Sequence, residues 1–152
     1  MDYITPFITW LLQSEYIKNN KIFLNAVQAK DNSLQIVTRQ IARNSVKKYV
    51  NGSKEYPITF NILNYKSVTH DQLVKTMIGS NENLETLLEV NQVITFVEEM
   101  ENQGNYPDFG ENYEVQSVYC EYSTPSSPAI DGNLSLAKYS IPIVCEVLEY
   151  DE

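Results

Sequence analysis

Histidine, cysteine and catalytic motifs are scarce in this sequence of 152 residues. It contains one histidine, His70, and two cysteines, Cys120 and Cys145. A zinc site needs about four closely spaced ligands, so a Cys/His metal centre has little support. His70 stands beside Asp71 in a Thr-His-Asp segment, a pattern more typical of a turn than of a catalytic dyad. Nucleophile elbows and glycine-rich phosphate loops are absent, so we expect neither an enzyme nor a bound cofactor.

Long apolar runs are also missing. No stretch reaches the roughly 18 apolar residues that a membrane-spanning helix needs. Residues 1–20 lack both a basic leading segment and a small-residue cleavage site, the marks of a signal peptide. We therefore expect no membrane insertion and no export, and we expect Cys120 and Cys145 to be small buried thiols on neighbouring strands.

Basic residues are absent between Lys75 and Lys138. Residues 1–75 hold ten Lys or Arg against five Asp or Glu, whereas residues 76–152 hold one basic residue against fifteen acidic ones. Two explanations stay open: a solvated acidic surface, or basic and acidic surfaces that meet between copies of the chain. The acidic half argues against nucleic-acid binding by that surface, since phosphate contacts need Lys and Arg.

The apolar pattern predicts two main helices. Phe7, Trp10 and Leu11 recur at helical spacing and predict a helix over residues 3–19, with Trp10 in the core. A broad apolar stripe predicts a second helix, which begins at Ser80 or Asn81 and ends at Gly104.

Strands are expected at residues 34–41, 113–123 and 138–150, in addition to a hairpin. The last strand alternates apolar and other side chains, but Pro142 cannot donate to a ladder and so indicates an edge or a bulge there. Residues 124–135 are rich in Pro, Ser and Gly and predict a loop. We expect one α+β domain over residues 1–152, with a mostly antiparallel or mixed sheet of about four to five strands.

The segment KKYVNGSKEYPITFNI, residues 47–62, predicts the hairpin. Asn-Gly between two β-rich runs is typical of a two-residue turn, here Asn51-Gly52. That turn would pair Lys48 with Glu55 and place Tyr49 on the packed face of the sheet. The packed face would then hold Tyr49, Tyr56, Ile58, Phe60 and Ile62.

Charged residues at the hairpin and at the end of the second helix are candidates for a subunit or partner interface. Glu98, Glu99 and Glu101 could serve acid–base chemistry, but their helical spacing favours a solvated face. The hairpin lysines could instead meet that acidic surface on a neighbouring copy. The interface candidates are Lys47, Lys48, Lys54, Glu98, Glu99 and Glu101.

Three segments occur in an informative order: the hairpin segment, then VITFVEEMENQGNYPDF, then KYSIPIVCEVLEY. Together they resemble the tail terminator, or tail-completion, proteins of long-tailed phages of Gram-positive bacteria, which are often called minor capsid proteins. The resemblance covers the chain from about Val46 onward and rests on the order of the motifs. The residues that carry it are Lys48, Tyr49, Asn51, Gly52, Tyr56, Phe60, Phe96, Glu98, Glu99, Gly104, Pro107, Tyr139, Ile141 and Tyr150.

The resemblance implies a non-enzymatic ring, hexameric in the family, that caps the head-proximal end of a tail tube. Such a ring stops polymerisation of the tube protein and presents a surface to the neck and connector proteins of the head. In a contractile tail or bacteriocin it also meets the sheath. DNA would pass through its lumen, and the protein would be assembled in the cytoplasm of a bacterial host and end in the virion tail.

Two other functions remain open from the sequence. A head-side neck adaptor is of similar size and also forms rings. A small ligand-binding domain would draw on the tyrosines near the 124–135 loop, namely Tyr106, Tyr113, Tyr119 and Tyr122.

Overall fold

The computed structural model describes residues 2–18, 21–24, 33–67, 81–122, 129–131 and 136–150. Its elements along the chain are α1 (Ile4–Leu11), α2 (Glu15–Lys18), β1 (Lys21–Leu24), β2 (Ser33–Thr38), the short 3₁₀ helix η1 (Arg43–Ser45), β3 (Lys47–Lys48), β4 (Lys54–Ser67), α4 (Asn81–Gln103), β5 (Tyr113–Cys120), β6 (Ala129–Asp131) and β7 (Leu136–Glu149).

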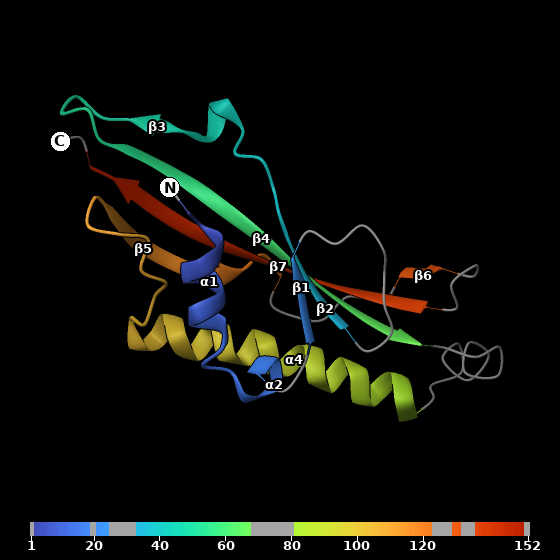
Figure 1. The fold of residues 1–152 in the computed structure, drawn as a ribbon. Helices are drawn as coiled ribbons and strands as arrows, with labels where there is room; N and C mark the ends of the chain where they lie inside the picture. The colour runs from blue at the N-terminus through green and yellow to red at the C-terminus, as the bar shows by residue number, and fades with distance from the viewer. Residues whose placement is uncertain are drawn as a thin grey trace.

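One open sheet organises the fold, with the strand order β1-β2-β4-β7-β5 (Figure 1). The short strands β3 and β6 extend it by pairing with β4 and β7. The β1–β2 pair is parallel and the other pairs are antiparallel. The two longer helices, α1 and α4, accompany this sheet, so the α+β prediction is confirmed.

The long strands β4 and β7 form the centre of the sheet, and their pairing sets its two faces. Ile58 pairs with Cys145 and Phe60 with Ile143, so apolar side chains of both strands share one face. We call this the inner face, since the helices pack on it, and the opposite one the outer face. The buried inner-face residues of the two strands are Tyr56, Ile58, Phe60, Ile62, Asn64, Tyr139, Ile141, Ile143, Cys145 and Val147.

Aromatic stacking joins α1 to the sheet and to α4. Phe7 stacks on Phe60 with ring centroids 3.7 Å apart, and Trp10 lies 5.2 Å from the ring of Phe96. The indole N–H of Trp10 donates to the carbonyl of Asn105 at 2.8 Å. Trp10 is 1% exposed, which confirms the expected core position.

The helix ends depart from expectation at one place. Instead of one helix over residues 3–19, α1 ends at Leu11 and α2 begins at Glu15. Backbone bonds from Gln13 to Trp10 and from Ser14 to Leu11 span three residues and close α1 with a tighter turn. The α4 helix ends as predicted, at Gly104, whose φ of +67° permits paired bonds back to Glu101 and, from Asn105, to Met100.

Two short strands depart from expectation. No residue pattern indicated β1, and β6 lies within the segment expected to be a loop. β7 is a central strand between β4 and β5, but Pro142 lies where one side of it is open, since the β5 ladder ends at Ile143 and the β6 ladder at Lys138. The Pro142 carbonyl accepts the N–H of Glu121 just after β5. Since the N and O of one strand residue point the same way, the missing N–H of Pro142 faces the stretch between β5 and β6.

Candidate interaction site

The β3–β4 hairpin forms, but with a register different from the predicted one. Lys47 lies opposite Glu55, and Lys48 lies opposite Lys54. The expected Lys48–Glu55 pair is therefore wrong by one residue. A directly opposed like-charge pair, which destabilises a ladder, takes its place.

A three-residue loop explains the shifted register. The N–H of Tyr49 donates to the carbonyl of Ser53 at 2.9 Å. The N–H of Gly52 donates to the carbonyl of Tyr49 at 3.0 Å. Gly52 has a φ of +88°, so a turn followed by a left-handed glycine replaces the two-residue turn. The Asn51 side chain accepts the N–H of Ser53 at 3.0 Å and holds the loop closed.

The one-residue shift moves Tyr49 to the other face of the sheet. Tyr49 is 48% exposed and does not join the inner-face residues. Its hydroxyl donates to the Glu55 carboxylate, and that hydrogen bond raises the Tyr49 pKa. Ser53, at the end of the same loop, is buried.

The six interface candidates do not share one environment. Lys47, Lys48 and Lys54 are exposed on the hairpin, and Glu98 and Glu99 are exposed on α4, in keeping with a solvated helix face. Glu101 is different, because its Oε2 accepts the backbone N–H of Val118 at 2.7 Å. The Glu101 carboxylate is thus already engaged in a hydrogen bond within the subunit.

The exposed basic and acidic candidates lie far apart. Figure 1 shows the β3–β4 hairpin at one end of the sheet and α4 along the other side of the molecule. Within the described part of the chain, the one ion pair joins Arg39 and Glu121 at 3.3 Å. The hairpin lysines and the two α4 carboxylates therefore have no opposite charge at contact distance among the described residues.

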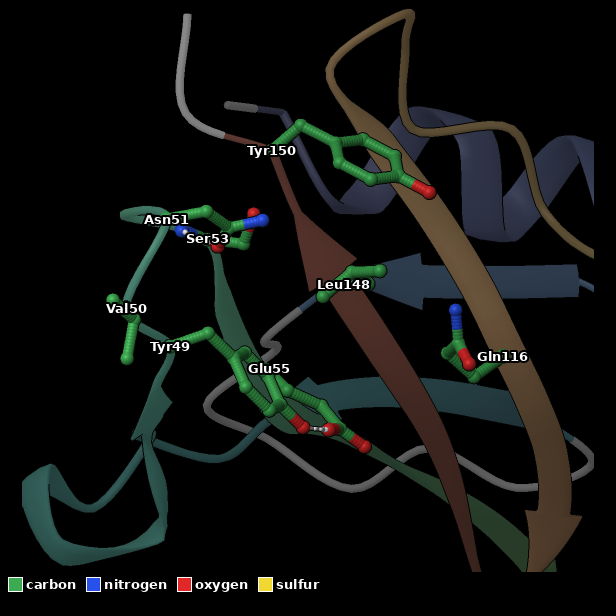
Figure 2. A pocket seen from close by; sticks show the side chains of 8 residues that line it. All are labelled: Tyr49, Val50, Asn51, Ser53, Glu55, Gln116, Leu148 and Tyr150. Carbon is green, nitrogen blue, oxygen red and sulfur yellow. Dashed lines mark hydrogen bonds between the residues drawn. The ribbon is translucent and has the colours of Figure 1, made fainter.

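A pocket of about 540 Å³ opens beside the hairpin (Figure 2). Tyr49 and Glu55 form one side and Gln116 of β5 the other, with Leu148 of β7 between them and Tyr150 above. The described residues that line it are Tyr49, Val50, Asn51, Ser53, Glu55, Gln116, Leu148 and Tyr150. The sequence did not reveal this pocket, because three distant segments build it.

A bulge in β5 places Gln116 in this lining. Val115 pairs with Val147 and Ser117 with Glu146, so Gln116 is an extra residue with no partner in the ladder. Such bulges bend a strand and redirect a side chain. No sequence signal marks this one.

Tyrosine hydroxyls donate to carboxylates repeatedly at this end of the sheet. Tyr150 donates to Glu114, and Tyr56 donates to Glu149 at 2.9 Å on the inner face. Farther along the outer face, Tyr119 donates to Glu146 at 2.9 Å. Burial, with the Glu146 bond second, raises the pKa of Tyr119 to about 12. The protonated, uncharged form of Tyr119 is therefore favoured over the phenolate.

The four tyrosines considered for a ligand site are not brought together. Tyr106 lines a cavity beside α1, whereas Tyr119 lines another between α4 and β5. Tyr113 is half-buried against the core and Tyr122 is exposed. The pocket described above uses none of them.

The two cysteines form no disulfide. Cys120 and Cys145 lie on neighbouring strands as free thiols, and burial raises the Cys120 pKa to about 12 and that of Cys145 further, so both stay protonated. No cluster of three or more potential metal-binding side chains occurs in the described ranges. His70 and Asp71 lie outside them.

No model of a known protein family matches the sequence, and no curated protein is significantly similar to it. No helix within the described part of the chain is long and apolar enough to cross a membrane.

Proposed function

We propose that the protein is a tail terminator, a ring-forming structural protein at the head-proximal end of a phage or phage-derived tail tube. The ring stops polymerisation of the tube protein and offers a surface to the neck. The ordered resemblance of three sequence segments supports this proposal. An α+β fold built on one open sheet is compatible with it.

The observation that carries the proposal is the separation of two uncompensated charged surfaces. Lys48 and Lys54 face each other on the hairpin, whereas Glu98 and Glu99 are exposed on α4. A ring forms when one surface of each subunit binds a different surface of the next, with a rotation that closes. Opposite charges on separate parts of one chain suit such a head-to-tail contact and steer it.

The acidic half of the chain also suits a conduit for DNA. Residues 76–152 hold fifteen acidic residues and one basic residue. A lumen wall with this balance repels phosphate and lets DNA pass without binding it. Lysine-rich surfaces would then belong in subunit contacts.

The deciding experiment compares tails assembled with and without this protein. Electron microscopy should locate it as a ring at one end of isolated tails, including tails made without heads. Tubes lacking the protein should grow beyond their defined length. A protein that stays monomeric alone and with tubes, together with tubes that still stop at the usual length, would refute the proposal. Its presence on heads and absence from isolated tails would favour a neck adaptor.

A further inference from the structure

We infer that the pocket beside the hairpin binds an arginine side chain presented by a protein partner. The inference concerns the single subunit, so it stands or falls independently of the tail terminator proposal. It rests on the aromatic walls of the pocket, on its hydrogen-bond acceptors and on the absence of a cation among the described residues that line it.

Two tyrosines form preoriented walls. Tyr49 and Tyr150 are 48% and 43% exposed, although each is a large ring that could pack inside. Their hydroxyls are tied to Glu55 and Glu114, which fixes the rings in place. A guanidinium group stacks on such rings and is attracted by their π-faces.

Acceptors lie between these walls. The Glu55 carboxylate uses Oε2 for Tyr49, which leaves further lone pairs for a donor. The Gln116 side chain faces the same space from β5, and among the described residues no partner occupies its amide. Two acceptors from opposite sides match the planar fork of arginine, whose five N–H donors exceed the three of a lysine ammonium.

Among the described residues, no Lys or Arg lines the pocket. The residue opposite Glu55 in the ladder is Lys47, which lies on the same face of the sheet yet forms no ion pair with it. The Glu55 charge is therefore shared with a tyrosine hydroxyl instead of being neutralised. A bound cation would neutralise it.

The rim of the pocket fits a protein partner better than a free small molecule. Val50 is fully exposed at the tip of the hairpin, and it lines the pocket together with the exposed rings of Tyr49 and Tyr150. Tyrosine-rich apolar rims around a polar centre are typical of protein interfaces, where arginine is a frequent anchor. The space of about 540 Å³ also leaves room for the backbone that carries the arginine.

The test titrates a blocked Gly-Arg-Gly tripeptide into the ¹⁵N-labelled full chain and follows backbone amide shifts by NMR. Saturable shifts should centre on Ser53, Gln116 and Leu148. The matched Gly-citrulline-Gly peptide has the same shape without the charge and should bind at least about tenfold more weakly. Equal shifts with both peptides, or no saturable shift up to about 10 mM arginine peptide, would overturn the inference.

Paired variants separate the pocket from the general charge of the sheet. Glu55→Gln should weaken arginine-peptide binding about tenfold, since a charge-assisted bond becomes a neutral one. Glu146→Gln alters the same kind of Tyr–Glu pair outside the pocket and should leave the affinity unchanged. Lys47→Gln removes a competing cation and should strengthen binding. Equal losses for Glu55→Gln and Glu146→Gln would contradict the assignment.

Discussion

The Glu101 carboxylate accepts the backbone N–H of Val118 at 2.7 Å and so ties the end of α4 to strand β5. β5 ends the strand order of the sheet, and an unpaired edge is open to pairing with other chains. Val118 pairs with Cys145 on its other side. The carboxylate thus blocks one position of this edge against an unwanted strand.

Replacing Glu101 with alanine should destabilise the protein by about 1–3 kcal/mol, because a part-buried backbone donor loses its partner. Urea denaturation measures the loss. The matched control is Glu98→Ala, which removes a carboxylate from an exposed site on the same helix and should change stability by less than about 0.5 kcal/mol. If the two variants lose the same stability, the edge contact has no special role.

The main elements could be predicted because their apolar periods are long. β7 alternates over most of its length, and α4 carries an apolar stripe that ends at a left-handed glycine. Short elements gave weaker signals. β1 has four residues and β6 has three, and tertiary pairing with β2 and β7 decides their conformation. Pro142 indicated an open stretch on one side of β7, because a missing N–H excludes pairing at one point and on one side, not a central strand.

Replacing Lys48 with glutamate should affect folding and assembly in opposite directions. It turns the like-charge pair with Lys54 into an attractive one, which should stabilise the monomer by about 0.2–1 kcal/mol. Under the proposed function it should also weaken ring assembly, most clearly at low salt, as measured by native mass spectrometry and thermal unfolding.

Lys18→Glu makes the same change of charge on α2, away from the hairpin, and is the control. It should leave assembly intact. A Lys48→Glu variant that assembles as well as the native chain at low salt would show that the hairpin lysines do not contribute to the subunit contact.

The interaction site could be predicted only in part. The sequence identified the hairpin and its lysines, but the choice between a two-residue and a three-residue loop reverses the face of Tyr49. An Asn-Gly pair is compatible with both loops, so the local turn signal does not choose between them. The bulge at Gln116 and the approach of Tyr150 also arise from tertiary pairing.

Stability should fall as the pH rises above about 10. Burial, followed by the Glu149 hydrogen bond, raises the pKa of Tyr56, and burial, followed by Glu89, raises the pKa of Tyr16 to about 12. A raised pKa in the folded state stabilises the fold below pH 10, and this contribution is lost as the unfolded tyrosines ionise. Denaturant titrations between pH 8 and pH 11 measure it.

The Tyr56→Phe variant isolates one of these tyrosines. At pH 8 it should be less stable than the native chain by about 1 kcal/mol, because Glu149 loses a donor. The gap should narrow by pH 11, since the variant has no Tyr56 hydroxyl to ionise in the unfolded state. Tyr122→Phe removes the same atom from an exposed position and is the control. A gap that stays constant with pH would contradict the assignment.

Truncating Phe7 should test how much of the fold depends on α1. Phe7 is buried and its ring stacks on Phe60 at 3.7 Å, so Phe7→Ala should cost about 3–5 kcal/mol through lost burial and the cavity left behind. Trp10, the single tryptophan, is buried nearby and its fluorescence reports unfolding. Leu12→Ala, just past the end of the same helix and 42% exposed, should cost less than about 0.5 kcal/mol. Similar losses at both positions would mean that α1 does not anchor the inner face of the sheet.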